Sequence, residues 1–428
     1  MNILMMTNTY KPIVGGLEKS VEIFSKEFRK KGHRVIIIAP EFENQVEEEG
    51  VIRIPAIQNF NGSDFSVQLP IPGVLSEKLG DFRADIVHSH HPYLVGDTAL
   101  RLAYKYNAPL VFTNHTLYEK NIHYVGEGEA LKRFIIELSS GYANLADHVF
   151  APSQSVAGIL KERDVKTPIT VVPTGIDTDF FERGDGDSVR KEFDIPKEAY
   201  VVGYAGRLAL EKNLEFLAQA VALFFKNHPM AYFLVVGDGP SKEAIENIFQ
   251  KEAVSERVRF TGSLRGEKLV AAYHAMDVFA FASHSETQGL VLVEAMAAGV
   301  PVVAQDAPGV REVMQDKVNG RMIASEGFGD FILALDWMKK RSPEELKKIC
   351  ESCLKTAKNF TTKKSVDRAL EIYKCLRSKN FKRRSDKEEN PWLQTVRIIK
   401  AQWDLTKNLA KAASTIITEA SVEEKSPS

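Results

Sequence analysis

One stretch of the 428-residue sequence, Ser283 to Val303, limits what the chain can fold into and do more than any other. Eight of the nine residues from Leu290 to Ala298 are apolar, and Gly299 follows them, which predicts a short buried helix. The exception is Glu294, and a second carboxylate, Glu286, precedes the run in a polar loop. Because a buried carboxylate is costly without a partner, Glu294 needs a reason to be there.

The start of the predicted helix offers the groups that a phosphorylated sugar requires. Gly289 stands just before it and lets the backbone come close to a ligand. The unpaired N–H groups of a first helical turn suit a phosphate. Ionised carboxylates accept hydrogen bonds without donating them, so Glu286 and Glu294 suit hydroxyl groups. The segment therefore predicts a site for a molecule that is part phosphate and part sugar.

Short apolar runs alternate with amphipathic runs along most of the chain, which predicts α/β domains built on parallel sheets. The strand candidates of the first half are Asn2–Met6, Val35–Ala39, Ile86–His88, Leu110–Thr113, His148–Ala151 and Ile169–Val172. Those of the second half are Tyr200–Tyr204, Ala231–Val236, Val258–Phe260, Val278–Phe281 and Val300–Ala304. Two doubly wound, Rossmann-like domains with a cleft between them are the simplest architecture, with ligands at the carboxyl ends of the strands.

The charged segment 177–200 is interpreted as the connection between the domains, which predicts domains at 1–180 and 181–375. Residues 376–428 are expected to form a basic linker, an amphipathic C-terminal helix over 391–420 and a tail. On this helix one apolar stripe contains Trp392, Val396, Ile399, Trp403, Ala410 and Ile417, and a second contains Ile398, Leu405, Leu409, Ala412 and Ile416. Arg397, Lys400, Lys407 and Lys411 share a third face, so the helix fits either an anionic membrane surface or the first domain.

The spacing of the two glutamates resembles a known motif. Glu286, seven intervening residues, Glu294 and then AMAAGVPVVA are similar to the paired-glutamate motif of retaining GT-B glycosyltransferases of family four. Arg207 and Lys212, in GYAGRLALEKNLEFL after a strand candidate, resemble the donor-phosphate signature of that family. Two cations at such a position can hold a diphosphate and stabilise it as a leaving group, whereas elsewhere they would be ordinary surface charges.

Two motifs of the first half fit the same family. The Gly15–Gly16 turn follows the first strand candidate and can present backbone N–H groups to a phosphate, although a pair of glycines is by itself a weak signal. His115 lies in NHTLYE, which resembles the acceptor-side histidine motif of the family. The same motif contains Tyr118 and Glu119, which are therefore also expected on the acceptor side. By this resemblance His115 would contact a sugar hydroxyl or hold the reacting groups, and it is otherwise a structural histidine.

The resemblance covers about residues 1–375 and implies a GT-B fold, a nucleotide-sugar donor in the second domain, and retention at the anomeric carbon. It implies catalytic roles for His115, Arg207, Lys212 and Glu286, with Glu286 on the hydroxyls of the transferred sugar. It assigns Glu294 to the ribose, and the diphosphate to Arg207, Lys212 and the backbone at Gly16, Gly289 and Leu290. The expected donor is a UDP-sugar, with a GDP-sugar as the alternative, and no cofactor is expected.

No metal site is expected. His88, His90 and His91 follow a strand candidate with no carboxylate at metal spacing beside them, and we assign them to the acceptor side. Asp177–Asp179 and Asp185–Asp187 both spell DxD, a metal-binding signature in glycosyltransferases of another fold, but both lie in the predicted connection. Cations and helix N-termini would then neutralise the diphosphate.

Of the predicted features, the identity of the acceptor is the one that the sequence determines least. ETQG at 286–289, and HTLYE followed by His123–Tyr124, are similar to diacylglycerol glucosyltransferases, which predicts a membrane lipid acceptor and glycolipid synthesis. A soluble sugar or sugar phosphate is the alternative acceptor, and a nucleotide-sugar epimerase or a non-enzymatic nucleotide-sugar binder remains open. A net charge of −1 gives no indication of nucleic acid. Since no run reaches the ~20 apolar residues of a membrane span, we expect a cytoplasmic protein, with peripheral contact to an anionic membrane.

Overall fold

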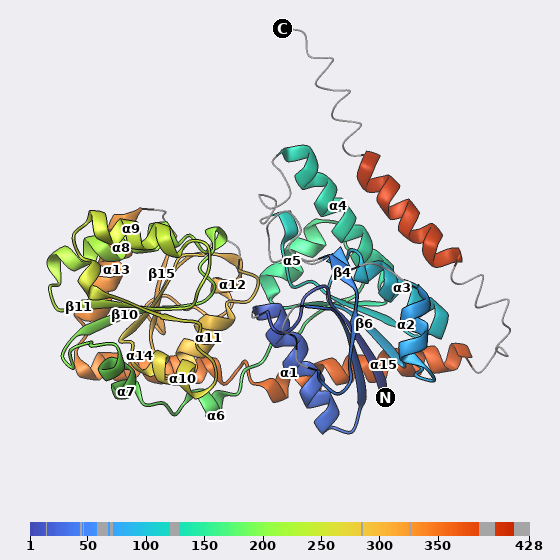
Figure 1. Cartoon of the computed structure of the whole chain (residues 1–428), viewed down its shortest axis with the longest axis horizontal. Helices are drawn as coiled ribbons and strands as arrows, with labels where there is room; N and C mark the ends of the chain where they lie inside the picture. The colour runs from blue at the N-terminus through green and yellow to red at the C-terminus, as the bar shows by residue number, and fades with distance from the viewer. Residues whose placement is uncertain are drawn as a thin grey trace, which may run out of the picture. The chain divides into compact units, whose positions relative to one another are not determined.

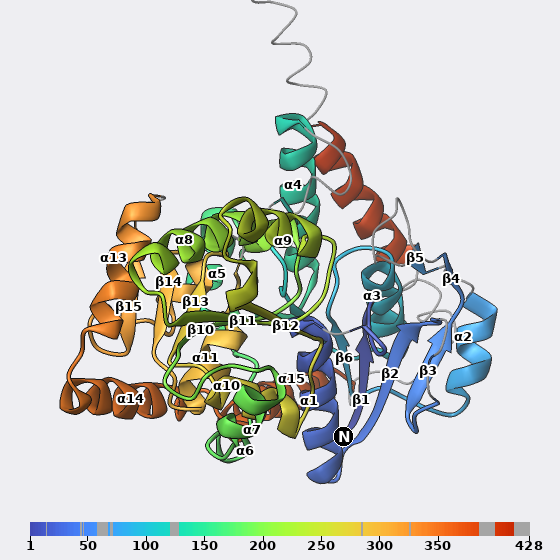
Figure 2. The same cartoon turned by 60° about the vertical axis from the view of Figure 1, so that its left-hand side comes forward.

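The computed structural model describes residues 1–13, 15–42, 45, 47–57, 67–68, 72–119, 128–283, 286–324, 327–384 and 399–414. The chain forms two compact units. The first contains Met1–Thr174 and the residues from Ser365 onward, and the second contains Gly175–Lys364. Each unit has a central sheet with helices on both faces (Figures 1 and 2).

The first unit is built on a seven-stranded parallel sheet in the order β3-β2-β1-β6-β7-β8-β9. Its strands are β1 (Asn2–Met6), β2 (Arg34–Pro40), β3 (Val51–Ile54), β6 (Ile86–Ser89), β7 (Leu110–Thr113), β8 (His148–Ala151) and β9 (Ile169–Val171). A small antiparallel pair, β4 (Ala56–Ile57) and β5 (Val67–Gln68), lies outside this sheet. The strand order reverses between β1 and β6, and open α/β sheets bind ligands outside the carboxyl ends of their strands at such a switch point.

Alternate residues of β1 pack on opposite faces of this sheet. The helices of the first unit are α1 (Gly16–Lys30), α2 (Pro72–Leu79), α3 (Val95–Tyr106), α4 (Glu129–Leu145), α5 (Gln154–Glu162) and most of α15 (Thr362–Arg384). Leu4 and Met6 join the core under α2, α3, α4 and α5, whereas Ile3 and Met5 join the core under α1 and α15. Both faces are therefore buried, which explains why these strands read as continuous apolar runs.

The second unit repeats the plan with a six-stranded parallel sheet in the order β12-β11-β10-β13-β14-β15. Its strands are β10 (Tyr200–Ala205), β11 (Ala231–Val236), β12 (Val258–Gly262), β13 (Val278–Phe281), β14 (Val302–Gln305) and β15 (Gly320–Ile323). The switch point lies between β10 and β13. The two predicted doubly wound sheets are thus confirmed.

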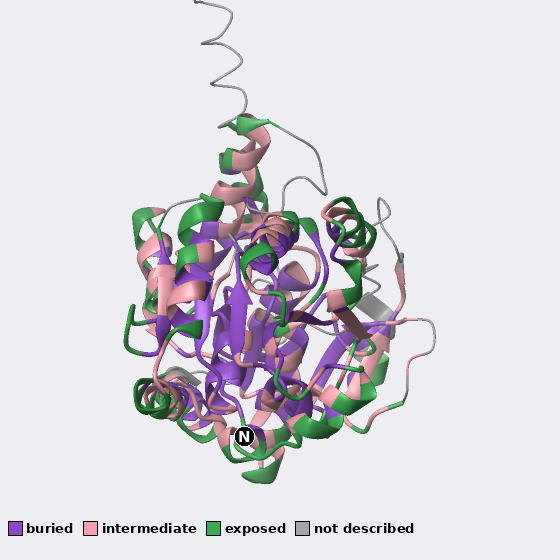
Figure 3. Ribbon diagram, turned by 90° about the vertical axis from the view of Figure 1, so that its left-hand side faces the viewer, coloured by how far each residue is buried: buried purple, intermediate pink, exposed green. Residues whose placement is uncertain are grey.

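Helices cover both faces of the second sheet, with α8, α9 and α13 on one side and α10, α11 and α14 on the other (Figure 1). The helices are α6 (Thr178–Phe181), α7 (Gly186–Glu192), α8 (Leu214–Asn227), α9 (Lys242–Lys251), α10 (Glu267–His274), α11 (Leu290–Ala297), α12 (Pro308–Arg311), α13 (Phe328–Lys339) and α14 (Pro343–Ala357), with 3₁₀ turns η3 (Leu210–Lys212) and η4 (Ser255–Arg257). Buried residues concentrate in the strands and exposed residues on the outer helical faces (Figure 3).

The limits of the units differ from the predicted ones. The first unit ends at Thr174, and the chain returns to it at Ser365, so the C-terminal residues belong to the first unit instead of forming a separate part. The segment 177–200 is not an open connection, because it carries α6 and α7. Helix α15 continues to Arg384, past the predicted end at 375, because Leu376 still packs on the core and Arg377 lies 3.2 Å from Asp85.

Residues 399–414 form a C-terminal helix that docks on α3 and α4 (Figures 1 and 2). Ala401 and Ala412 are fully buried, and Leu405 packs against the core of the first unit. Asn408 Nδ2 donates to the Leu138 carbonyl at 3.0 Å, and Tyr104 donates its hydroxyl to Asp404 at 3.0 Å. Of the two predicted apolar stripes, the one with Leu405 and Ala412 therefore faces the protein, except that its Leu409 is 52% exposed. The rest of the predicted helix, 391–398 and 415–420, lies outside the described residues.

Candidate active site

The switch point of the second unit brings together three loops, which follow β10, β13 and β14. Ser283 donates its hydroxyl to the Glu211 carbonyl at 3.1 Å, which ties the β13 loop to the β10 loop. Asn213 Nδ2 donates to Gln305 Oε1 at 3.1 Å, which ties the β10 loop to the end of β14. Because these strands are neighbours in the sheet, side chains more than 70 residues apart in sequence meet here.

Glycines allow these loops to approach one another. A Cβ on Gly309 would lie 2.6 Å from the Gln288 backbone nitrogen, so α12 can only pack under the 286–289 loop without a side chain there. Gly309 N donates to the Glu286 carbonyl at 3.0 Å and holds that loop in place. Gly289 itself has φ +71°, a left-handed conformation that favours glycine. The sequence indicated Gly289, but Gly309 was missed because nothing local marks a contact across strands.

Lys212 and Glu286, both predicted, are ion-paired with each other. Lys212 Nζ lies 2.5 Å from Glu286 Oε1, and the two side chains are 22% and 15% exposed. Burial alone would lower the pKa of Lys212, but the adjacent Glu286 carboxylate outweighs it and raises that pKa. The lysine therefore stays charged, and its three N–H donors can serve both a carboxylate and a phosphate.

The remaining predicted donor-side groups flank this pair along the chain. Arg207 is exposed just after β10, where its carbonyl accepts a hydrogen bond of 3.1 Å from the Tyr204 hydroxyl. Gly289 is the N-cap of α11, and Leu290 is its first residue. Because glycine has no side chain, no side chain of the N-cap residue bonds to this helix end. The N-terminus of α11 lies directly after the loop that carries Glu286.

Glu294 is buried in α11, only 3% exposed. It accepts a hydrogen bond of 2.9 Å from the hydroxyl of Tyr273, a fully buried residue of α10. Burial, and then the Glu294 carboxylate, raise the pKa of Tyr273 well above its usual range, so Tyr273 stays protonated and donates. Tyr273 is thus the partner that a buried carboxylate requires, and no local sequence pattern marks it as one.

In the first unit, His115 meets His90. His90 Nδ1 and His115 Nε2 are 2.9 Å apart, and the two rings stack with centroids 5.2 Å apart. Although part of the His115 side chain remains accessible, burial lowers the pKa of His115 to about 3. The pKa of His90 is also well below its usual value, because it is buried and has other histidines around it. Both rings are therefore neutral near pH 7.

His88 and His91 have protein partners as well. His88 contacts Thr113 Oγ1 at 2.6 Å and the hydroxyl of Tyr373 in α15 at 2.5 Å. His91 Nδ1 accepts a hydrogen bond of 3.1 Å from the Asn8 backbone. Burial, and then the neighbouring His115, lower the pKa of both histidines to about 3.

Glu119 and Tyr118, the other predicted acceptor-side residues, differ from each other in their contacts. Glu119 forms a two-point ion pair with Arg163, at 2.7 and 3.3 Å, and is buried, which is a structural arrangement. Tyr118 packs its ring edge-on against Tyr93, with the ring centroids 5.2 Å apart, and its buried hydroxyl has no partner in the structure.

Gly16, a predicted donor-side residue, is the first residue of α1, whose first turn already carries the Glu18 carboxylate. His123–Tyr124 lie outside the described residues.

Among the described residues, no group of three or more His, Cys, Asp or Glu side chains is arranged to hold a metal ion. The first aspartate of each DxD pair is an N-cap. Asp177 accepts from Phe180 N at 3.2 Å in α6, and Asp185 accepts from Ser188 N at 3.1 Å in α7. Asx side chains at such positions stabilise helix ends, which accounts for Asp177 and Asp185.

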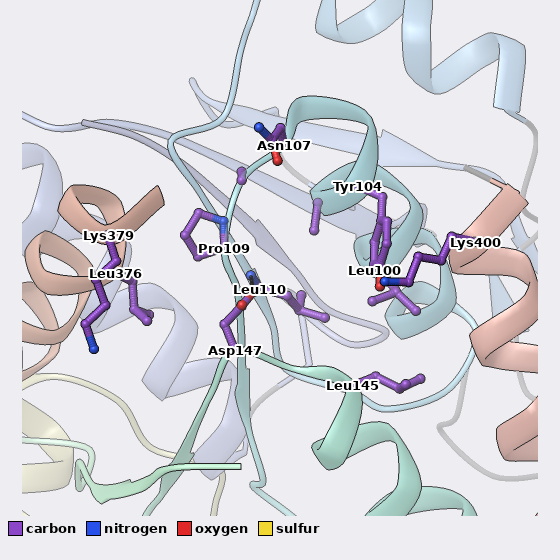
Figure 4. A pocket seen from close by; sticks show the side chains of 12 residues that line it. Leu100, Tyr104, Asn107, Pro109, Leu110, Leu145, Asp147, Leu376, Lys379 and Lys400 are labelled. Carbon is purple, nitrogen blue, oxygen red and sulfur yellow. Dashed lines mark hydrogen bonds between the residues drawn. The ribbon is translucent and has the colours of Figure 1, made fainter. Parts of the chain in front are cut away.

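A cavity of about 470 Å³ lies at the opposite end of the first sheet, beside Leu110, the first residue of β7. Figure 4 shows it between Lys379 of α15 on one side and Tyr104 and Lys400 on the other. Because it is at the amino ends of the strands, it is not the predicted site. Across the described part of the chain, no helix combines the length and apolar character needed to cross a membrane.

Comparison with known proteins identifies the family and the fold. Residues 14–180 match the Glycosyltransferase Family 4 domain, and residues 185–360 match the Glycosyl transferases group 1 domain. The chain is 29% identical over 334 residues to the alpha-monoglucosyldiacylglycerol synthase of Streptococcus pneumoniae, covering 76% of each chain. It is 31% identical over 317 residues to the D-inositol 3-phosphate glycosyltransferase of Segniliparus rotundus, covering 71% of this chain and 69% of the relative. The structure of Anabaena HepE in complex with UDP-glucose has a TM-score of 0.71 at 19% identity, covering 88% of this chain and all of that one, and shows the shared GT-B fold.

Proposed function

Because the chain belongs to the family-four glycosyltransferases, we propose that it moves a hexose from a nucleotide-diphosphate sugar to a hydroxyl acceptor, with retention at the anomeric carbon. The observation that carries this proposal is the Lys212–Glu286 pair beside the N-terminus of α11. It sets a cation for the diphosphate and a carboxylate for sugar hydroxyls within hydrogen-bond distance of each other, at a sheet switch point.

Each donor-side group has a distinct task in this proposal. Lys212, Arg207 and the N–H groups at Gly289 and Leu290 bind the diphosphate and stabilise the charge that grows on it as it leaves. Glu286 accepts hydrogen bonds from the hydroxyls of the transferred hexose. Glu294, oriented by Tyr273, accepts from the ribose hydroxyls. Gly16 adds backbone N–H groups from α1.

The transfer itself needs no protein nucleophile on this proposal. The bond between the anomeric carbon and the phosphate oxygen breaks, and the acceptor oxygen bonds to the same face of that carbon. The acceptor proton passes to the departing phosphate oxygen, so the products are a glycoside and a nucleoside diphosphate. His115 is neutral and hydrogen-bonded to His90, so it orients a hydroxyl and does not supply a charge.

The favoured acceptor is a membrane lipid such as diacylglycerol, and the favoured donor is a UDP-sugar. Support for the acceptor comes from the relative named as a monoglucosyldiacylglycerol synthase, and support for the donor from the UDP-glucose complex of HepE. A soluble sugar or sugar phosphate is the alternative acceptor, since another relative is named for D-inositol 3-phosphate. A GDP-sugar is the alternative donor.

A lipid acceptor calls for contact with a membrane, and the outer face of the helix 399–414 suits that contact. Ile399, Trp403 and Leu409 are 61%, 60% and 52% exposed, although the helix is docked by its other face. Lys400, Lys407 and Lys411 are exposed on one flank of this face. Apolar side chains with a basic border match an anionic bilayer surface, so we place the protein on the cytoplasmic side of such a membrane.

Release of nucleoside diphosphate from a panel of UDP- and GDP-sugars, with and without diacylglycerol vesicles, tests the activity. We expect turnover with a UDP-hexose that requires the lipid and yields an α-linked product from an α-linked donor. Turnover with soluble sugars instead of lipid would establish the alternative acceptor. Conversion of the donor sugar without any acceptor would indicate an epimerase, and tight binding without turnover would indicate a binding protein.

Co-flotation with anionic vesicles tests the membrane contact. The double substitution Ile399→Asn/Trp403→Asn should reduce vesicle binding about tenfold or more, because it removes the exposed apolar area without touching the docked face. Leu333→Asn in α13, where the side chain is 64% exposed, is the matched control and should bind as the wild type does. Equal binding by all three proteins would refute the contact. Truncation before residue 399 is less informative, because it also removes the docking contacts.

A further inference from the structure

Gln305 is a buried polar residue at the end of a buried strand. It is the last residue of β14 and is 3% exposed, and it follows Val302, Val303 and Ala304, which are fully buried. Its Oε1 accepts a hydrogen bond of 3.1 Å from Asn213 Nδ2, whereas its Nε2 has no hydrogen-bond partner among the described residues. An unpartnered buried N–H group costs free energy, and an apolar residue of the same size would avoid that cost. The fold alone therefore does not explain a glutamine here.

Asn213, the partner of Gln305, stands where the loop after β10 enters α8. It directly follows Lys212 and has φ +53° and ψ +42°, a left-handed conformation that few residues other than glycine adopt. Asparagine is one of those few, and unlike glycine it brings an amide. Because glycine would serve the backbone of this turn equally well, the asparagine side chain itself requires an explanation.

The hydrogen bond between Asn213 and Gln305 joins the turn that carries Lys212 to a fixed part of the sheet. Gln305 is paired with Ile323 in the ladder between β14 and β15, so its backbone position is set by the sheet. In the strand order β13 lies between β10 and β14. The turn after β10 must therefore extend past the carboxyl end of β13, and the bond to Gln305 holds it there.

A second hydrogen bond holds the same turn one residue before Lys212. Ser283, which follows β13, donates its hydroxyl to the Glu211 carbonyl at 3.1 Å. The residues on the two sides of Lys212, Glu211 and Asn213, are therefore tied to the ends of two different strands. Lys212 Nζ lies 2.5 Å from Glu286 Oε1, and displacements of about 1 Å matter for groups that act on a reacting centre. These two bonds set where the ammonium group lies.

We propose that the Asn213–Gln305 hydrogen bond is a clamp that positions Lys212 for the diphosphate, which makes Gln305 a positioning residue of the donor site. The inference rests on the proposed function, in which Lys212 stabilises the charge that grows on the diphosphate. The clamp acts without touching the donor, because it keeps the ammonium group beside Glu286. The unpartnered Nε2 is the free-energy cost of placing an amide at the end of β14.

Gln305→Leu and Asn213→Gly break the clamp by two different routes. The first removes the acceptor together with the unpartnered amide, and water can replace the acceptor because Asn213 is only half-buried, so its stability should equal or exceed that of the wild type. The second removes the donor and keeps the left-handed turn. We expect each variant to lower kcat about tenfold, with the donor KM changed about twofold or less. The loss is smaller than that for Lys212→Ala because the cation is still present.

Gln219→Leu is the matched control. Gln219 lies in α8 of the same unit, and its Nε2 donates to Glu252 Oε1 at 3.2 Å, so the variant also breaks a hydrogen bond of a glutamine amide. Because this bond does not involve the turn that carries Lys212, the variant should keep the kcat and KM of the wild type. A tenfold loss in Gln219→Leu as well would mean that the effect is a general one, and would overturn the proposal.

Combined variants show whether the clamp acts through Lys212. Gln305→Leu in the Lys212→Ala background should lower kcat no further, because no cation is left to position. Gln305→Leu together with Asn213→Gly should be no slower than either variant alone, because both break one bond. Losses that multiply in either combination would overturn the proposal, and so would an unchanged kcat in both single variants.

Chemical modification of Lys212 separates the clamp from the proposed function, because it needs no transferase activity. An adjacent carboxylate favours the charged form of an amine, and only the neutral form reacts with an acylating reagent. In competitive acetylation followed by mass spectrometry, Lys212 should react faster in Gln305→Leu and Asn213→Gly than in the wild type and in Gln219→Leu. This pattern in a protein without transferase activity would leave the clamp standing and refute the function. Equal rates in all four proteins would refute the clamp, whatever the activity.

Discussion

The two sheets of this protein have the same kind of switch point, yet they fill it with opposite chemistry. At β10 and β13 of the second unit, the loops carry Lys212, Glu286 and Arg207, all charged groups. At β1, β6 and β7 of the first unit, the corresponding ends carry Asn8, His90 and His115, which are neutral. The backbone plan is shared, so the difference lies in the loops alone.

This difference indicates how work is divided between the units. A diphosphate leaving group gains negative charge, and fixed cations stabilise it best. A hydroxyl acceptor is uncharged, and a buried charge beside it would only add a desolvation cost. The contrast therefore predicts that substitutions in the second unit affect the chemical step, whereas those in the first unit affect binding and stability.

The largest effect is expected for Glu286→Ala. On the proposed function the variant loses the carboxylate that accepts hydrogen bonds from the hydroxyls of the transferred hexose, and we expect the transfer rate to fall by about 10³-fold or more. Because Lys212 is then released from its ion pair, the affinity for UDP should be unchanged or increased, as measured by calorimetry. Glu256→Ala, at an exposed position of the same unit, is the control. Normal turnover in Glu286→Ala would remove this residue from the site.

Lys212→Ala and Arg207→Ala should each lower kcat by about 10²–10³-fold, the typical loss when a group that stabilises transition-state charge is removed. Their stabilities should differ. Lys212→Ala leaves Glu286 without its partner and should cost about 1–3 kcal/mol of unfolding free energy, whereas Arg207 is exposed and should cost little. Denaturant titration of both variants measures this. Wild-type rates in either variant would mean that the diphosphate binds elsewhere.

The histidine cluster should make the first unit sensitive to acid. The pKa values of His88, His91 and His115 are about 3 in the folded protein, against about 6.5 in an unfolded chain. Above pH 6.5 these histidines are neutral in both states and do not change the free energy of unfolding. As the pH drops from 6.5 toward 3, only the unfolded chain takes up the protons, so the free energy of unfolding falls. Hydrogen exchange at pH 7 and pH 5 should show the first unit opening more readily at pH 5. Equal protection at the two pH values would contradict this.

The smallest effect is expected from metal removal. Since Asp177 and Asp185 are helix N-caps and the proposed donor site contains cations, transfer should continue at an unchanged rate in excess chelator. Loss of activity that magnesium or manganese restores would contradict the assignment of the diphosphate to Lys212 and Arg207, and would place Asp179 and Asp187 under test as ligands.

Much of the fold was predictable from the sequence because its signals are local. All the predicted strands are present, since a buried parallel strand is a short apolar run that any window of the sequence reveals. The edge strands β3 and β15 were missed, because Val51–Ile54 and Gly320–Ile323 each carry an arginine and are half exposed. The end of α15 was also misplaced, because its last turns are charged and are held by Arg377 and Asp85, which are far apart in sequence.

By itself, the sequence determined the two-sheet plan and singled out Glu286, Glu294, Arg207 and Lys212, all of which lie in short continuous motifs. Tertiary structure alone decided which of these groups meet. It paired Lys212 with Glu286, placed Tyr273 on Glu294, and joined His90 to His115. It also decided which stripe of the C-terminal helix is buried, through Leu405 and Ala412. The physical reason is that strand order, which no local pattern encodes, determines which loops become neighbours.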